Sequence, residues 1–273
     1  MGRFSSVDAW AEKYPSHSPY NYVFNNPIKL IDPTGNGPTG DIYSTNGIHL
    51  GSDGVDDNRV YITNSTDQLT EDQASLLVLA HDFVGTWSGN EGGGGLTELG
   101  IGHDAFQTLA ATVYGESGNS NNSKEMFGIA SAIVNNNTAR GENASLTNTI
   151  SDIAYAASDG NARYSKFTEA SVGARGNNKG MTTANAAAIN ALSGGRDYSN
   201  GATGWDGNDL PTNSHRFGLN ISNPSHDIYG VGNSPLTQRE NGSSYRRQST
   251  AAHGGTMFYK IHPTFVSGGG RAY

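Results

Sequence analysis

Apolar residues recur at three- and four-residue intervals through the middle of the chain, a spacing that places them on one face of an α-helix. In the segment 103–116, Phe106, Leu109, Val113 and Glu116 fall at i, i+3, i+7 and i+10. The first three predict a buried apolar stripe, and the fourth adds a carboxyl group to that stripe at the last turn. Similar spacing predicts further helices at about 123–137, 147–158 and 182–193.

Local signals indicate where some of these helices begin, end and face the core. Thr70 and Gln73 form a capping box that opens another helix, and Gly194 is a C′ residue that ends the helix at 182–193. The helix at 147–158 has one apolar face, made by Ile150, Ile153, Ala154 and Ala157. Ile129, Ile133, Ile189 and Leu192 are further core candidates.

Two stretches favour β-strands. Residues 41–63 are expected to form short strands joined by turns, with Val60 and Ile62 on one face and Tyr61 on the other. Residues 255–261 predict a closing strand, and loops rich in glycine and asparagine connect the remaining elements. We therefore expect a mainly helical α+β domain with a small closing β-sheet.

The composition limits the classes of function. Only 34% of the residues are hydrophobic, 37 are glycine, and the mean hydropathy is −0.54, so much of the chain is expected to be loop. A formal net charge of −8 disfavours a protein that grips phosphate backbones, and the basic stretch at 245–247 is short. The absence of cysteine excludes disulfides, thiolate metal sites and a cysteine nucleophile. No HExxH pattern occurs, and no apolar run reaches membrane-spanning length. We expect no metal, no cofactor, no nucleic-acid partner and no membrane insertion.

Glu116 is the candidate catalytic residue. Burial disfavours a charged carboxylate, and so does the partial negative charge at a helix C-terminus. Both effects raise the pKa of Glu116, so we expect the group to hold a proton at neutral pH, as a general acid must. The alternative is that Glu116 simply ends the helix and points into solvent.

The residues around Glu116 resemble the cell-wall hydrolase family typified by the spore-cortex lytic enzyme SleB. That family carries a YGE-type motif, a loop and then an apolar helix, which Tyr114–Ser117 and the helix from Met126 match. The similarity continues in the same order through Ala186–Ala202, Trp205-Asp206-Gly207 and the closing segment His253–Tyr259, and covers about residues 103–262. This chain departs from the pattern at Asn136, where the family usually has arginine, in the loop Ser117–Asn119, and in the insertion at 211–242.

The resemblance implies a lysozyme-like fold and cleavage of the bond between N-acetylmuramic acid and N-acetylglucosamine in peptidoglycan. Glycosidases normally use two carboxylates. Lytic transglycosylases of this kind can use one glutamate, because the nucleophile is the 6-hydroxyl of the muramic acid itself. In muramidases the nucleophile is water. Asp206 is the candidate for a second carboxylate, with a turn residue as the alternative.

Six further residues are expected to bind substrate. Aromatic rings stack on the CH faces of sugars, which makes Trp205, Tyr198 and Tyr259 candidates to line the groove, although each is also compatible with the core. Ser117 is a candidate to form a hydrogen bond to substrate, or else to cap the helix. His253 is a candidate to orient Glu116 or a sugar, or else has a purely structural role. Tyr114 enters this set through the motif that it opens.

The first 36 residues resemble the end of the RHS repeat-associated core, in the order GRF, AEKY, SPYNY, NNPI and IDPTG. In that family a β-rich shell encloses a C-terminal toxin. The resemblance implies delivery by a secretion apparatus into the periplasm of a target cell, with no signal peptide needed, and an immunity protein in the producer. We therefore expect three parts: an RHS-core end at 1–36, a β connector at 37–66 and a SleB-like hydrolase domain at 67–273.

Two other functions remain open from the sequence. One is a metal-dependent nuclease toxin using His215, His226 or Asp227, which are scattered potential ligands in the second half of the chain. The other is a non-catalytic module that binds the cell wall.

Overall fold

A computed structural model describes residues 41–54, 57–88, 95–158, 160–206, 247–261 and 266–273. The segment 1–36 and the nuclease candidates His215, His226 and Asp227 lie outside these ranges. The described elements are β1 (Asp41–Ser44), β2 (His49–Ser52), β3 (Val60–Thr63), α1 (Glu71–Ser88), β4 (Thr97–Glu98), α2 (His103–Glu116), α3 (Ser123–Arg140), α4 (Leu146–Ser158), α5 (Ala162–Glu169), α6 (Val172–Gly176), α7 (Lys179–Leu192), β5 (Gly204–Asp206), β6 (Arg247–His253) and β7 (Thr256–Ile261).

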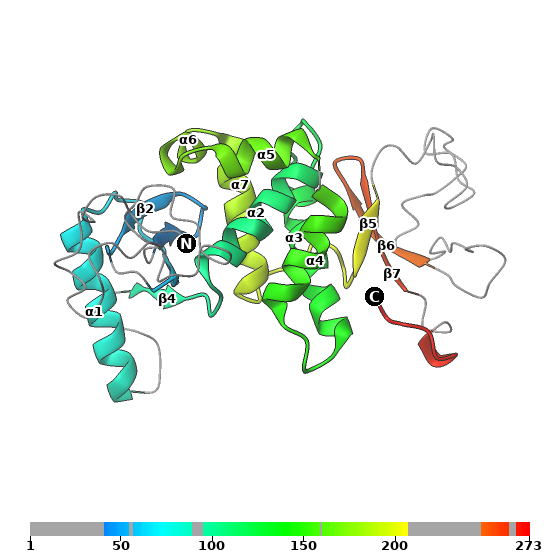
Figure 1. The fold of residues 1–273 in the computed structure, drawn as a ribbon, viewed down its shortest axis with the longest axis horizontal. Helices are drawn as coiled ribbons and strands as arrows, with labels where there is room; N and C mark the ends of the chain where they lie inside the picture. Colours follow the sequence, from blue (N-terminus) through cyan, green and yellow to red (C-terminus); the bar gives the residue numbers. More distant parts are fainter. Residues whose placement is uncertain (1–40, 55–56, 89–94, 159, 207–246, 262–265) are drawn as a thin grey trace, which may run out of the picture.

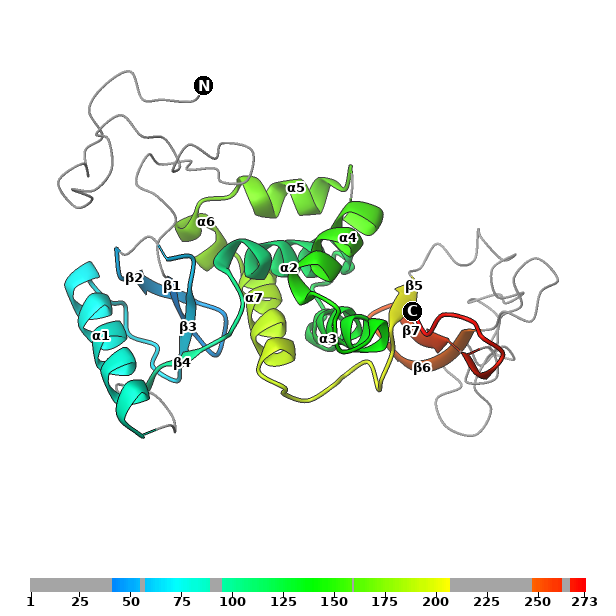
Figure 2. The same ribbon diagram turned by 60° about the horizontal axis from the view of Figure 1, so that its bottom comes forward.

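The chain has an α+β fold, as the sequence predicted. A helical body built around α2 lies between two small sheets, one formed by β1–β4 and the other by β5–β7 (Figures 1 and 2). Helix α1 packs on the first sheet, away from the helical body. No helix within the described ranges has the length and apolarity to cross a lipid bilayer.

The first sheet has the strand order β2-β1-β3-β4, with β1 parallel to β3 and the other pairs antiparallel. Side chains alternate between its faces. Ile42 and Tyr61 face a small core beneath α1, whereas Tyr43, Val60 and Ile62 join the main core of the helical body. The predicted alternation of Val60, Tyr61 and Ile62 is thus confirmed, and both faces of the sheet are covered.

Helix α1 begins at the predicted capping box. The Thr70 N–H donates to Gln73 Oε1 at 2.9 Å, and the Gln73 N–H donates to Thr70 Oγ1 at 3.3 Å. Ala74 and Val78 then pack against the first sheet. Helix α1 and strand β4 thus pack with the strands of the expected connector.

The helical body follows the predicted stripes closely. Phe106, Leu109 and Val113 are fully buried in α2, which contacts α3, α4, α5 and α7. The core candidates Ile129, Ile133 and Ile189 are also buried, and Leu192 packs at the edge. Gly194 follows α7 with a φ of 67°, as expected of a C′ residue. Helices α5 and α6 were not predicted from the sequence.

One predicted helix face is corrected by the structure. Ile150 and Ala154 of α4 are buried, but Ala157 is exposed and Ser158 takes the inward position with 1% exposure. The inward positions therefore follow i, i+4 and i+8, because α4 turns this side of the helix towards α2 and α3.

The second sheet is antiparallel, in the order β5-β7-β6. The predicted strand at 255–261 is β7, and its Phe258 enters the main core against α3. The close approach requires glycine on the helix, since a Cβ at Gly128 would lie 2.5 Å from the Phe258 ring. Strands β5 and β6 were not predicted.

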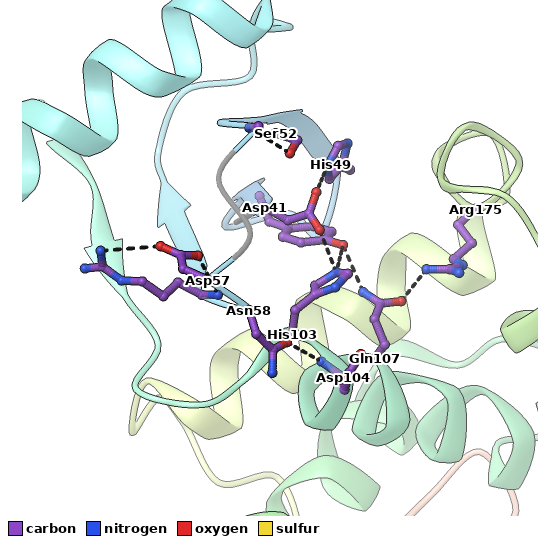
Figure 3. Close-up of polar contacts among 12 residues, drawn as sticks. Asp41, His49, Ser52, Asp57, Asn58, His103, Asp104, Gln107 and Arg175 are labelled. Atoms are coloured by element: carbon purple, nitrogen blue, oxygen red, sulfur yellow. Dashed lines mark hydrogen bonds and ion pairs between the residues drawn. The ribbon is translucent and has the colours of Figure 1, made fainter. Parts of the chain in front are cut away.

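A buried polar network joins the first sheet to the helical body (Figure 3). Asp41 of β1 contacts His49 through Oδ1 and His103 Nε2 through Oδ2, the second at 3.0 Å. His103 is the first residue of α2, and Tyr43 and Gln107 continue the network at 3.1 and 2.9 Å. These contacts fix the start of the helix whose other end carries Glu116.

Candidate active site

Glu116 is the last residue of α2 and is half-buried, as its place on the apolar stripe indicated. Three donors surround its carboxyl group. Trp205 Nε1 lies 3.4 Å from Oε2, while Ser158 Oγ and Asn161 Nδ2 lie 3.4 and 3.5 Å from Oε1. These distances are at the long end for hydrogen bonds, which is common at catalytic groups without bound substrate. The carboxyl group thus sits where α2, α4, the start of α5 and β5 meet.

The structure brings Trp205 to Glu116 and separates Asp206 from it. Adjacent residues of a strand point to opposite faces. Trp205 pairs with Phe258 of β7 and packs against the main core, whereas Asp206 pairs with Met257 and is 9% exposed. Strand geometry therefore directs the Asp206 carboxyl away from the face that carries Trp205.

Two other residues of the YGES motif, Tyr114 and Ser117, are buried next to Glu116. Tyr114 is 3% exposed, and its ring lies beneath the Arg163 guanidinium at 4.1 Å from the ring centre. Ser117 is 4% exposed; its Oγ donates to the Tyr114 carbonyl at 3.1 Å, and its N–H donates to the Val113 carbonyl. The backbone of Ser117 therefore ends α2, which agrees with the capping alternative.

Arg163 of α5 holds the chain on both sides of Glu116, a role that sequence reasoning missed. It donates to the Tyr114 carbonyl at 2.9 Å, to Ser117 Oγ at 3.3 Å and to Asn121 Oδ1 at 2.9 Å. The donor comes from a residue 46 positions from Ser117, so no local pattern could have pointed to it. The guanidinium fixes the loop between α2 and α3.

Tyr198 and His253 form a second group. His253 Nε2 lies 3.0 Å from the Tyr198 carbonyl, so this ring nitrogen carries the proton. The two rings are 6.5 Å apart, and Phe127 of α3 packs edge-on to Tyr198 at 5.4 Å. Tyr259 lies on β7 with its ring against Gly204, where a Cβ would be 2.8 Å from the ring. These contacts tie the second sheet to α3.

Glu125, in the first turn of α3, is a buried carboxyl that sequence reasoning also missed. It is 2% exposed, and Thr256 Oγ1 donates to its Oε1 at 2.7 Å. Burial raises the pKa of Glu125, although the bonds from Thr256 and the Gly118 backbone and the charges of Arg163 and His253 act in the opposite direction. A carboxylate in the first turn of a helix is usually stable in solvent, so its position in the sequence gave no signal.

Asn136 has a defined role at the position where the SleB-like family usually has arginine. Its Nδ2 donates to the Thr203 carbonyl at 2.9 Å, and its Oδ1 accepts from Arg140 Nε at 2.9 Å. It thereby links α3 to the residue that precedes β5. The asparagine helps to position the strand that carries Trp205.

A groove of about 400 Å³ lies between α2, α4 and α5. Its wall includes Ser158, which contacts Glu116 Oε1. Gly115 allows α5 to lie this close, because a Cβ there would be 3.0 Å from Tyr164 Cβ. The groove is lined by Thr108, Ser151, Ala154, Tyr155, Ser158, Gly160, Tyr164 and Ser165.

Within the described ranges, no group of three or more histidine, aspartate or glutamate side chains is arranged to hold a metal ion. Comparison with known proteins gives no match: no family model, no curated protein and no solved structure is similar to this chain. A function for the chain therefore rests on the geometry around Glu116 and on the sequence motifs that contain it.

Proposed function

We propose that the chain cleaves the glycan strand of peptidoglycan between N-acetylmuramic acid and N-acetylglucosamine, with Glu116 as the acid and then the base. The observation that carries the proposal is the position of Glu116: a half-buried carboxyl at the end of α2, next to Trp205 and in contact with Ser158, which lines a groove. The resemblance of the ordered motifs to the SleB-like family supports this choice of substrate and implies a lysozyme-like fold for the helical body.

In the first step the Glu116 carboxylic acid donates its proton to the glycosidic oxygen. The bond between this oxygen and C1 breaks, and one sugar leaves with a new hydroxyl group. In the second step the Glu116 carboxylate takes a proton from the attacking hydroxyl as its oxygen bonds to C1. The attacker is the 6-hydroxyl of the same muramic acid in a transglycosylase, or water in a muramidase.

The surroundings of Glu116 suit the second stage. Trp205, Ser158 and Asn161 offer N–H or O–H groups that stabilise the carboxylate once its proton has gone. Trp205 also presents an aromatic surface on which a sugar ring can stack. The opposite orientation of Asp206 favours the route with one carboxylate, in which the substrate supplies the nucleophile.

Residues 1–36 suggest how such an enzyme reaches its substrate. Their resemblance to the end of an RHS core supports a toxin that is carried by the RHS shell and a secretion apparatus and acts in the periplasm of a target cell. The producer then needs an immunity protein. Periplasmic expression that lyses the host, without lysis on cytoplasmic expression, is the expected result; equal toxicity in both compartments contradicts this route.

The enzymatic proposal is tested with Glu116→Gln on purified sacculi. Glutamine keeps the shape of the side chain but cannot donate a proton as an acid, so we expect release of muropeptides to fall at least about 100-fold. Glu142→Gln is the matched control, because Glu142 is exposed. Unchanged lysis by Glu116→Gln refutes the proposal, provided that both variants melt at the temperature of the unmodified protein.

Mass spectrometry of the released fragments separates the two reactions. Anhydro-muramyl ends identify the transglycosylase, and reducing muramic acid ends identify the muramidase. Binding of sacculi without any released fragment identifies the non-catalytic wall-binding module instead.

A further inference from the structure

The groove beside Glu116 has an unusual lining. Its eight residues contain four hydroxyl groups from serine and threonine, two tyrosines and no charged side chain. Its volume of about 400 Å³ falls within the range of about 300–1,000 Å³ in which small-molecule sites occur. Neutral hydroxyl groups together with aromatic rings suit an uncharged ligand that has both hydroxyl groups and apolar faces.

Tyr155 of α4 is the most exposed of the large apolar side chains in the described residues, at 79%. It stands on the rim of the groove, while its neighbour Ala154 is buried beneath. An exposed aromatic ring contributes little to the fold, because it removes little apolar surface from water. It is available for a flat ligand to stack on.

The hydroxyl groups around Tyr155 retain capacity to bind. Thr108 Oγ1 and Ser151 Oγ donate to the carbonyls of Asp104 and Thr147, at 2.8 and 3.0 Å. A hydroxyl oxygen that donates one hydrogen bond can still accept two. Both can therefore accept from the hydroxyl or amide N–H groups of a sugar.

Ser158 links the groove to the site around Glu116. Ser158 lines the groove and contacts Glu116 Oε1, whereas Trp205 contacts Oε2. Thr108 lies eight residues before Glu116 on α2, which corresponds to about 12 Å along the helix axis. The span from Thr108 to Glu116 is thus long enough for more than one sugar ring.

We propose that this groove binds the sugar rings of the glycan strand on the side of Glu116 away from Trp205, with one ring stacked on Tyr155. The assignment rests on the proposed function, since it takes the substrate from there. A phosphorylated ligand would need basic side chains, and none lines the described groove.

The test uses the full chain with Glu116→Gln, so that the substrate is not consumed. Glycan strands stripped of their peptides by an amidase are titrated in a calorimeter, with free peptide stems as the second ligand. Tyr155→Ala is compared with Tyr155→Phe, which keeps the ring. Leu79→Ala, a change at a 66% exposed apolar side chain on α1, is the matched control.

We expect Tyr155→Ala to weaken binding of the stripped strands roughly two- to tenfold, the range that corresponds to one aromatic stacking contact. Tyr155→Phe and Leu79→Ala should bind as the parent does. With Glu116 intact, Tyr155→Ala should raise the apparent KM for sacculi and leave kcat within about twofold, because the ring is remote from the bond that breaks.

Equal affinity of Tyr155→Ala and its parent overturns the proposal, and so does binding of peptide stems in preference to stripped strands. Failure of the catalytic proposal looks different. In that case Glu116→Gln still lyses sacculi, whatever Tyr155 does to binding. If Glu116→Gln abolishes lysis but Tyr155→Ala has no effect on binding, the catalytic proposal is supported and the proposal that the groove binds sugar rings is refuted.

Discussion

Replacement of Asp41 by asparagine tests the polar network that joins the first sheet to the helical body (Figure 3). The Asp41 side chain is 8% exposed and contacts two histidines, His49 and His103. Asparagine has nearly the same volume, so the change removes the charge and one acceptor but creates no cavity. It leaves two partly buried rings that face an amide.

The magnitude follows from the burial of these groups. Weakening hydrogen bonds to a buried carboxylate costs about 1.5–3 kcal/mol, because the remaining polar groups lose their partner without fully regaining water. For a chain of this size that corresponds to a fall in Tm of roughly 3–12 °C. Tyr43 and Gln107, which continue the network, are expected to lose order with it.

The pH dependence gives a second and independent signature. Burial alone would raise the pKa of Asp41, but hydrogen bonds from His103 and His49 outweigh it and hold this pKa well below the ordinary value of 3.8. A lowered pKa in the folded state adds stability that is complete above pH 3.8 and is lost as the pH falls below it. The unmodified protein should therefore lose stability in acid more steeply than Asp41→Asn does.

The assay is urea denaturation followed by circular dichroism, at pH 7 and at several values between 5 and about 2.5. Asp152→Asn is the matched control: Asp152 pairs with Arg140 at 2.7 Å, but its side chain is 63% exposed. Such a surface pair contributes about 0–1 kcal/mol. A loss in Asp41→Asn no larger than in Asp152→Asn would refute the reasoning.

Two further predictions concern the region where α3 meets the second sheet. Gly128→Ala places a Cβ 2.5 Å from the buried Phe258 ring. The overpacking costs about 1–3 kcal/mol, whereas the higher helix propensity of alanine contributes about 1 kcal/mol in the other direction. We therefore expect the free energy of unfolding, measured by urea denaturation, to fall by up to about 2 kcal/mol. A Gly128→Ala protein more stable than its parent contradicts this packing. Glu125→Gln mimics the protonated carboxyl that burial favours, so its stability should fall less than that of the parent as the pH rises above 4.5, the ordinary pKa of a glutamate. Parallel curves of Tm against pH for Glu125→Gln and the parent, measured by thermal melts between pH 4 and 8, would rule out a raised pKa for Glu125.

The sequence by itself determined the parts of this protein that depend on near neighbours. Phe106, Leu109 and Val113 lie within three turns of one helix, so their spacing was enough to predict α2, its buried face and the terminal position of Glu116. The capping box at Thr70 and the C′ glycine Gly194 are local for the same reason. Each depends on backbone groups within a few residues, which the sequence specifies directly.

Only the tertiary structure decided which distant side chains meet. Arg163 reaches the backbone beside Glu116 from another helix, Asp41 binds the first residue of α2 from a strand, and Glu125 is buried by a hairpin far along the chain. The sheet that directs Asp206 away from Trp205 and the groove under Tyr155 likewise come from packing. A side chain's exposure depends on what covers it, and contacts across many residues leave no periodic trace in the sequence.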